Sequence, residues 1–295
     1  MKFAVLADLH FTYEAPISRV DDYFATAIRK MKWVRNYIGE DTPLIIAGDI
    51  FDVAKPRNFF KMYASVESVL KNTHTIVGNH DISYHNLSYL PETAYAVLAK
   101  STGCDIHQVT KMGDFELHPF DFGVELQHEK SVFGLPMIAI THEFIYKDKQ
   151  KFVKGREFSA ILKEFPEYAI IISGDNHQHF IEEYEGRYLI NNGSLLRRTA
   201  GQIDYKPVVT IWEDGVINTI PIPIEADAVS NGHIIASNAR ELAKGNMLAY
   251  MELVKNADRE VYDFNSNLLS KIINITDKPT HEVLMEIYTE LQEKA

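Results

Sequence analysis

The sequence contains very little cysteine: Cys104 is the one cysteine among 295 residues. An intramolecular disulfide is therefore impossible, and a zinc cluster built from several thiolates is excluded. So little cysteine is typical of a reducing compartment, and we expect a cytoplasmic protein.

Long apolar runs are also absent. No run approaches the ~18 residues that span a bilayer, and the first ten residues, MKFAVLADLH, reach a charged side chain at Asp8. This beginning lacks the apolar core and the cleavage site of a signal peptide. We therefore expect no membrane segment and no membrane partner.

Positive charge is scarce as well. Lys and Arg number 30 against 41 Asp and Glu, which gives a formal net charge of −11. Nonspecific DNA binding depends on clustered basic side chains that displace counterions from phosphates. A role on DNA would therefore need bound divalent metals or a basic partner to supply positive charge. The alternative is an acidic enzyme for a small substrate.

The chain does have an ordinary globular composition, with 46% hydrophobic residues. Its dominant pattern is a short apolar run that stops at a polar cluster, as expected of strands buried on both faces. Five such runs are KFAVLAD (2–8), PLIIAGD (43–49), HTIVGNHD (74–81), PMIAITHE (136–143) and AIIISGDNH (169–177). Apolar residues at helical spacing predict helices over 19–38 and 58–70. This alternation of strands and helices indicates a layered α/β fold.

The later part of the chain changes character. Residues 180–224 again favour strands, whereas 225–295 are polar and helix-prone. We therefore predict a main domain over 1–224 and a C-terminal helical region over 225–295, with a final helix at about 279–294. The segment 104–142 is rich in Phe, His and Gly and shows little helical period.

Polar side chains follow the apolar runs, and in open α/β sheets ligands gather at the carboxyl ends of strands. Carboxylate, imidazole and amide ligands without thiolate suit Mn, Fe, Zn or Mg. Two metals about 3.5–4 Å apart need a bridging carboxylate, and Asp49, alone after its glycine, is the expected bridge. The candidates are Asp8, His10, Asp49, Asn79, His80, Asp81, His142, Asp175 and His177.

These residue types suit phosphodiester hydrolysis. Two cations neutralise the anionic diester and lower the pKa of a bound water, so that hydroxide forms near neutral pH. The leaving alkoxide then needs a proton, and His80, directly after Asn79, is placed to donate it.

In their order along the chain, these motifs resemble the calcineurin-like metallophosphoesterase superfamily. They are D-x-H at 8–10, GDIFD at 48–52, GNHD at 78–81, a lone His142 and a late G-x-x-H. The resemblance covers about residues 1–215 and implies a four-layer α/β/β/α sandwich. More narrowly, GDIFDVAKPR and HTIVGNHDISYHN resemble the small nuclease subunit of SbcCD-type, or Mre-type, DNA repair complexes, especially the phage recombination versions.

The narrower resemblance implies a Mn²⁺-dependent DNA exonuclease or endonuclease in the cytoplasm of a bacterium or a phage-infected cell. Mg²⁺, Fe²⁺ and Zn²⁺ are the alternative metals. It also implies an SMC-like ABC ATPase as the large subunit, and a homodimer formed through residues 56–70 and 83–99.

The resemblance further implies a role for each candidate. Metal one takes Asp8, His10, Asp49 and the last histidine of the final motif. Metal two takes Asp49, Asn79, His142 and the first ligand of that motif. His80 matches the catalytic histidine, and Asp81 matches a carboxylate that orients it. Position 52, a histidine in some of these nucleases, is Asp52 here.

The final motif leaves two registers open. The family's Gly-His-x-His stands here as Gly174-Asp175-Asn176-His177-Gln178-His179. If the glycine that ends the strand sets the register, the ligands are Asp175 and His177. If the spaced histidine pair sets it, they are His177 and His179. We prefer the first, because a ligand should follow the strand end at once, and a carboxylate there favours hard metals such as Mn or Mg.

Two further groups have open roles. Tyr84, Tyr89 and Tyr95 are candidates for stacking on bases, although half-buried surface tyrosines are the commoner case. Arg197 and Arg198 are candidates for phosphate contact, with surface charge or packing as an equal alternative.

The C-terminal helices also have two interpretations: they complete the core, or they grip the ATPase coiled coil through Leu268, Leu269, Ile272 and Ile273. Three functions remain for the whole chain. They are a metal-dependent nuclease, a phosphoesterase for a small molecule or a protein, and a binding subunit that kept the fold without the chemistry. The near-complete ligand set argues against the third.

Overall fold

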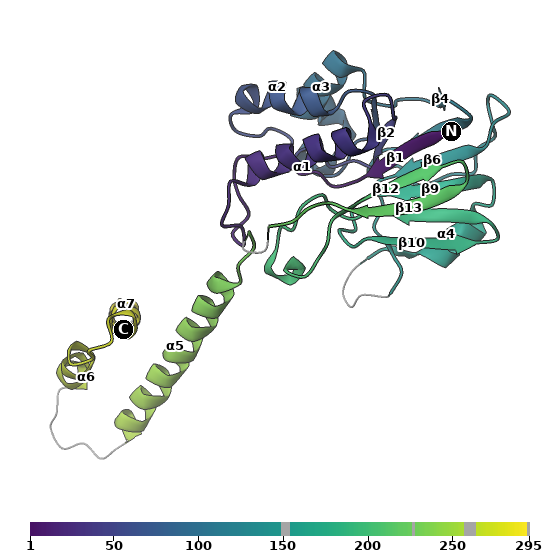
Figure 1. The fold of residues 1–295 in the computed structure, drawn as a ribbon. Helices are drawn as coiled ribbons and strands as arrows, with labels where there is room; N and C mark the ends of the chain where they lie inside the picture. The colour runs from purple at the N-terminus through teal and green to yellow at the C-terminus, as the bar shows by residue number, and fades with distance from the viewer. Residues whose placement is uncertain (149–153, 226–227, 257–263, 294–295) are drawn as a thin grey trace. The chain divides into compact units, whose positions relative to one another are not determined.

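The computed structural model describes residues 1–148, 154–225, 228–256 and 264–293. They fall into two compact units, Met1–Val229 and Ser230–Ala295 (Figure 1). The first unit ends a little beyond the predicted boundary at 224, because Val229 forms a β-bridge with Arg19.

The first sheet of the main unit has the strand order β13-β12-β1-β2-β3. Its strands are β1 (Lys2–Leu6), β2 (Leu44–Ile46), β3 (Thr73–Thr75), β12 (Val208–Glu213) and β13 (Val216–Pro221). β1, β2 and β3 are parallel, so their carboxyl ends meet at one edge of the sheet. The β12–β13 hairpin pairs antiparallel with β1 through β12.

The second sheet has the order β10-β11-β9-β6-β5-β4. Its strands are β4 (Thr110–Met112), β5 (Phe115–Phe120), β6 (Met137–Thr141), β9 (Tyr168–Ser173), β10 (Phe180–Tyr184) and β11 (Arg187–Asn191). The four central strands are parallel, and β4 and β10 are antiparallel edges. A short parallel ribbon joins β7 (Ile145–Tyr146) and β8 (Arg156–Glu157).

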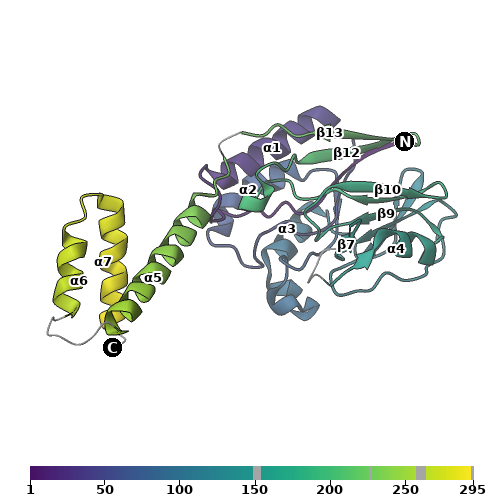
Figure 2. The same ribbon diagram turned by 90° about the horizontal axis from the view of Figure 1, so that it is seen from below.

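Helices cover the outer faces of both sheets. Figure 1 shows α1 (Tyr23–Ile38), α2 (Phe59–Val69) and α3 (Ala94–Thr102) on one side. Figure 2 shows α4 (Phe158–Glu164) on the other side, beside β9 and β10. Short 3₁₀ turns lie at η1 (Ser83–His85), η2 (Leu87–Glu92) and η3 (Ala200–Gln202).

Alternate residues of the central strands pack into different cores. In β1, Leu6 packs toward α1–α3, whereas Phe3 and Val5 pack between the two sheets. In β6, Ile138 and Ile140 join the core between the sheets, and Ala139 joins the core beneath α4. Three cores therefore separate four layers, which confirms the predicted α/β/β/α sandwich.

Local capping explains where the predicted helices begin. The helix predicted over 19–38 starts at Tyr23, because the Asp22 side chain accepts a hydrogen bond from the Ala25 N–H at 3.0 Å and caps it. The helix predicted over 58–70 is α2. The segment 104–142 forms β4, β5 and β6, and its polar strand residues are the reason that its pattern is weak.

The second unit contains α5 (Gly232–Asn256), α6 (Phe264–Ile273) and α7 (Lys278–Gln292). Its small core includes Leu268 and Ile272, whereas Ile273 is exposed. Asp277 caps α7 through the Thr280 N–H, close to the predicted start at 279. Within the described ranges, no helix is long and apolar enough to cross a membrane.

Candidate metal centre

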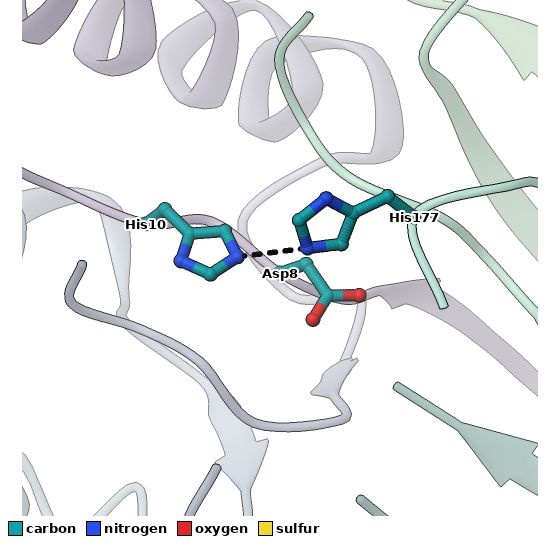
Figure 3. Close-up of side chains that lie close together, drawn as sticks. All are labelled: Asp8, His10 and His177. Carbon is teal, nitrogen blue, oxygen red and sulfur yellow. Dashed lines mark hydrogen bonds between the residues drawn. The ribbon is translucent and has the colours of Figure 1, made fainter. Parts of the chain in front are cut away.

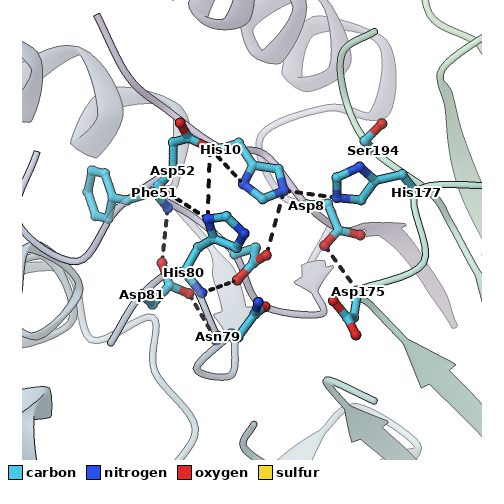
Figure 4. A network of polar contacts seen from close by, with 12 residues as sticks. Asp8, His10, Phe51, Asp52, Asn79, His80, Asp81, Asp175, His177 and Ser194 are labelled. Carbon is cyan, nitrogen blue, oxygen red and sulfur yellow. Dashed lines mark hydrogen bonds and ion pairs between the residues drawn. The ribbon is translucent and has the colours of Figure 1, made fainter. Parts of the chain in front are cut away.

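The predicted ligands come together where the parallel strands of both sheets end. They follow β1 (Asp8, His10), β2 (Asp49), β3 (Asn79), β6 (His142) and β9 (Asp175, His177). Figure 4 shows their loops converging on one region. This is the strand-end arrangement that the sequence predicts.

Four of these positions have an uncommon backbone conformation. Asp8, His10, Asp49 and Asp175 have left-handed φ angles of 52°, 48°, 53° and 73°. Such angles are uncommon outside glycine and persist where the surrounding structure enforces them. Two glycines allow the close approach of the loops, since a Cβ on Gly78 would overlap the Asp49 carboxylate and one on Gly174 would overlap the Ala47 carbonyl.

The first group of candidate ligands is Asp8, His10 and His177 (Figure 3). Their ligand atoms lie within 4.8 Å of one another, and the Nε2 atoms of the two histidines are 3.1 Å apart. Burial, followed by the charge of Arg198, lowers the pKa of His10 and lowers that of His177 to about 4. Both rings are therefore neutral at pH 7, which leaves lone pairs for a cation.

The second group contains Asp8, Asp49 and His142, with Asn79 beside them. His142 Nδ1–H donates to the Ala47 carbonyl at 2.6 Å, which turns Nε2 toward the centre. Nε2 lies 2.9 Å from the Asn79 side-chain amide and 3.4 Å from Asp49 Oδ1. A metal-ligating histidine usually donates its other ring N–H in this way.

The charges of this group act strongly on one another. Burial by itself would lower the pKa of His142, but the Asp49 carboxylate raises it to about 10. Burial raises the pKa of Asp8 to about 8, and among the described residues Asp8 Oδ2 has no hydrogen-bond partner. A divalent cation would ionise Asp8 and replace the proton on His142 Nε2. The donor set therefore fits divalent metals.

Asp49 stands between the two groups. Its Oδ1 faces His142, and its Oδ2 lies 3.6 Å from His10 Nε2. Burial alone would raise the pKa of Asp49, but the neighbouring histidines, His142 above all, hold it below its usual range. An ionised carboxylate with one oxygen toward each group has the geometry of a bridging ligand.

The two registers of the final motif are separated in space. The Asp175 N–H donates to Asp8 Oδ1 at 3.1 Å, and Figure 4 shows the Asp175 side chain beside Asp8. The charges of His142 and Asp49 both act on its carboxyl. His179 instead faces the main chain of Asn191 and Asn192. The structure thus brings Asp175 and His177 to the centre and leaves His179 outside it.

His80 lies at the centre, as predicted, but the group that orients its ring is not the predicted one. Its Nδ1–H donates to the Asp52 carbonyl at 2.6 Å, and its side chain is 37% exposed. The prediction that Asp81 orients His80 is wrong. The Asp81 carboxylate accepts hydrogen bonds from the main-chain N–H groups of Ile50, Phe51 and Gly78, so it ties the loop after β2 to the loop after β3.

An ion pair that the sequence did not reveal lies beside the centre. Arg198 contacts the Asp52 carboxylate, whose Oδ1 is 3.4 Å from His10 Nδ1. The one available signal was the pair Arg197-Arg198 itself, and its partner is 146 residues away in the chain.

The three tyrosines have different environments. Tyr84 is 85% exposed and Tyr89 is 40% exposed, with ring centroids 5.4 Å apart. Tyr95 is buried, and its hydroxyl donates to Asp105 at 2.6 Å. The stacking role is therefore wrong for Tyr95 and stays open for the other two.

A cavity of about 790 Å³ opens beside the ligands. Its lining includes His142 and Asp175 from the centre, together with Glu143, Lys154 and Arg156. A substrate in this cavity would therefore meet the candidate metal ligands directly.

Comparisons with known proteins agree with this geometry at the level of family. Residues 1–211 match the model of the calcineurin-like phosphoesterase superfamily domain. A comparison with curated proteins found no match.

Solved structures with partial similarity include TT1561 of Thermus thermophilus, at 11% identity and a TM-score of 0.49 over 76% of this chain and 100% of that one. An archaeal phosphodiesterase is 18% identical, with a TM-score of 0.43 over 75% and 99%. Wild-type Vps29 of Entamoeba histolytica with Zn²⁺ is 14% identical, with a TM-score of 0.34 over 75% and 98%.

Proposed function

The chain belongs to the calcineurin-like phosphoesterase superfamily, and from this membership we propose that it is a two-metal phosphodiesterase that cleaves DNA. The family is one of metal-dependent hydrolases of phosphoester bonds. The observation that carries the two-metal proposal is the position of Asp49, with one carboxylate oxygen toward each ligand group.

The residues divide between the two metals in the following way. Asp8, His10, Asp49 and His177 would hold one cation. Asp49, Asn79, His142 and Asp175 would hold the other. When bound, the cations neutralise the phosphodiester and supply a hydroxide near neutral pH. Mn²⁺ suits this oxygen-rich and imidazole-containing set, as Mg²⁺, Fe²⁺ and Zn²⁺ also do.

His80 supplies the proton that the leaving alkoxide needs. The Asp52 carbonyl fixes its Nδ1–H, and its main-chain N–H donates to Asp49 Oδ1 at 2.9 Å. The ring is thereby held beside the bridging carboxylate with Nε2 available to the substrate. The His80 side chain is 37% exposed, against 21% for Asp52, and a general acid that meets the substrate must be accessible to it.

The DNA assignment rests on the motifs of residues 48–86 and on the aromatic residues that follow His80. Tyr84 and Tyr89 present exposed rings within ten residues of it. Exposed aromatic side chains stack on bases without sequence preference. The net charge of −11 implies that the metals, or a partner, supply the positive charge.

The partners are further proposals. An SMC-like ABC ATPase would bind the second unit, where Ile235, Leu242 and Ile273 are exposed. Leu268 and Ile272 are taken up by the internal core of that unit. A second copy of the chain would pack on α2, where Phe60 is 93% exposed. Action in the cytoplasm remains a prediction.

Degradation of end-labelled linear DNA, single- and double-stranded, in Mn²⁺ tests the function. We expect cleavage that Asp49→Ala abolishes and that Asp41→Ala, an exposed acidic control, leaves unchanged. Hydrolysis of bis-p-nitrophenyl phosphate with intact DNA would favour a small-molecule phosphoesterase. Bound metal without hydrolysis of either substrate would contradict the proposal and favour a binding subunit.

A further inference from the structure

Two adjacent arginines of the segment after β11 have different environments. Arg197 is 3% exposed and donates to the main-chain carbonyls of Ile203 and Glu225. It therefore ties main-chain segments together. Arg198 contacts the Asp52 carboxylate at the edge of the metal centre. Packing accounts for Arg197, whereas Arg198 lies beside the candidate chemistry.

The main chain holds Arg198 against the metal-ligand loops. The Leu195 N–H donates to the Asp8 carbonyl at 3.2 Å, and the Ser194 N–H donates to the His177 carbonyl at 3.3 Å. The Gln202 side chain accepts from the Arg198 N–H at 2.7 Å and donates to the Ser194 hydroxyl at 3.1 Å. The guanidinium is thus presented from a backbone that is fixed to the centre.

Asp52 links the guanidinium to the catalytic side of the centre. One carboxylate oxygen, Oδ1, contacts Arg198 and lies 3.4 Å from His10 Nδ1 and 3.9 Å from His80 Nδ1. The Asp52 carbonyl holds the His80 ring. Arg198 therefore lies on the His80 side, where the leaving oxygen of a diester would be protonated.

The guanidinium also has unused hydrogen-bonding capacity. Its Nε is buried, and the Tyr23 hydroxyl interacts with the guanidinium. The side chain is nevertheless 14% exposed, so the exposed N–H groups of the fork are the ones available to a ligand. An arginine offers five N–H donors in a planar fork that matches phosphate oxygens. Charge-assisted bonds of this kind are about twice as strong as neutral ones.

We propose that Arg198 binds a phosphate oxygen of the substrate at this centre and that Asp52 holds the guanidinium in position for it. The inference rests on the proposed function and identifies the residue that recognises the phosphate group. It adds one positively charged side chain to the charge that the metals would supply, in a chain whose net charge is −11. Asp52 is a positioning residue, and its own negative charge would repel a phosphate once Arg198 is removed.

The test measures inhibition by inorganic phosphate and hydrolysis of bis-p-nitrophenyl phosphate with the full Mn²⁺-loaded chain. For Arg198→Gln we expect the phosphate Ki and the KM of the diester to rise about tenfold or more, with the Mn²⁺ content unchanged. Arg198→Lys, which keeps the charge without the fork, should show a smaller rise. Arg57→Gln removes an exposed cation that is paired to Glu14 and should change neither constant.

A double variant tests the role of Asp52. If the carboxylate repels phosphate once Arg198 is gone, Asp52→Asn combined with Arg198→Gln should bind phosphate more tightly than Arg198→Gln alone. Unchanged phosphate inhibition in Arg198→Gln would overturn the proposal. So would a loss of bound Mn²⁺ that accounts for the whole effect. If Arg198→Gln does not fold, the phosphate Ki and the diester KM of Arg198→Lys and Asp52→Asn are compared with those of the wild type instead.

Phosphate binding can also be followed without turnover, because a ligand of the folded state raises the melting temperature. Stabilisation by phosphate in the wild type, weakened in Arg198→Gln, would support the inference even if no diester were hydrolysed. Hydrolysis by the wild type with equal stabilisation of both proteins would overturn the inference and leave the proposed function standing.

Discussion

Two buried carboxylates of this molecule have nearly opposite environments. Asp8, at the end of β1, is 1% exposed, and Glu116, in β5, is 0% exposed. Glu116 accepts hydrogen bonds from the Ser131 hydroxyl and from the N–H groups of Val132, Phe133 and Leu135. Asp8 accepts one from the Asp175 N–H, and within the described ranges its Oδ2 has no partner.

The pKa values follow from these contacts. Burial by itself would raise the pKa of Glu116, but the Ser131 hydroxyl and the main-chain donors lower it to about 2. Burial raises the pKa of Asp8 to about 8. A buried carboxylate with a full set of donors stabilises a fold, whereas one that faces other acceptors is costly unless a cation binds. The hydrogen-bond donors around a buried carboxylate therefore distinguish a structural acid from a candidate metal ligand.

The largest expected effect comes from Asp49, whose two carboxylate oxygens face His10 and His142. Asp49→Ala should lower kcat for bis-p-nitrophenyl phosphate by about 10³-fold or more, because several kcal/mol of transition-state stabilisation depend on the metals. Steady-state kinetics in Mn²⁺ would measure this, with circular dichroism to confirm folding. A variant that keeps more than a tenth of the wild-type rate would contradict the bridging role.

Asp8→Asn tests the carboxylate that lacks hydrogen-bond donors. The isosteric amide should weaken Mn²⁺ binding by about 100-fold or more, since even the supporting partners of metal ligands contribute 10–100-fold. The metal-free variant should be at least as stable as the wild type, because a poorly solvated carboxyl is removed. Calorimetric Mn²⁺ titration and urea unfolding measure the two effects. A variant that binds Mn²⁺ normally but unfolds more easily would reverse the interpretation.

Glu116→Gln tests the carboxylate that has a full set of hydrogen-bond donors. An amide cannot accept from all four donors, so we expect a loss of about 2 kcal/mol in the free energy of unfolding. Activity per folded molecule should be unchanged. Urea unfolding with an unaltered m-value, beside the same kinetic assay, would show this. A loss of activity without a loss of stability would place Glu116 in the chemistry and contradict its structural role.

The smallest effect, taken per unit of pH, is a change in stability with pH. In the folded chain Asp8 and Asp81 have pKa values raised by burial to about 8 and about 7, against an unfolded value of 3.8. From about pH 6.5 to pH 8 the histidines of the unfolded state have lost their protons, so the low pKa values of His10 and His177 no longer affect stability, while the folded state still holds protons on its buried carboxyls. The stability of the metal-free protein should therefore fall as pH rises over this range, by at most about 1.4 kcal/mol per pH unit for each proton.

Asp8→Asn should flatten this slope, and saturating Mn²⁺ should reduce it, because the metal binds the ionised carboxylate. Urea unfolding of the metal-free protein at a series of pH values measures it. A stability that rises over the same range would show that Asp8 is ionised without a metal.

Much of the fold and most of the candidate ligand positions could be predicted from the sequence, because they depend on local patterns. The strand ends at Asp8, Asp49 and His142 follow from apolar runs that stop at polar residues. The layered sandwich follows from the alternation of those runs with helices and from the resemblance.

The remaining features depend on loops that meet only in the folded chain. The main-chain partners of Asp81, the donors around Glu116 and the pairing of Arg198 with Asp52 leave no spacing to recognise. β5 could not be predicted for a related reason, since its buried Glu116 and His118 interrupt the apolar pattern expected of a buried strand.

The most direct test of a two-metal centre is the amount of metal that each chain retains. We would equilibrate wild-type protein, Glu116→Gln and Asp8→Asn with Mn²⁺ by dialysis and count the bound ions by mass spectrometry. The predicted result is two Mn²⁺ per chain for the wild type and Glu116→Gln, and one or fewer for Asp8→Asn. Fewer than one Mn²⁺ per wild-type chain, or equal retention by all three proteins, would contradict the assignment of these residues as metal ligands.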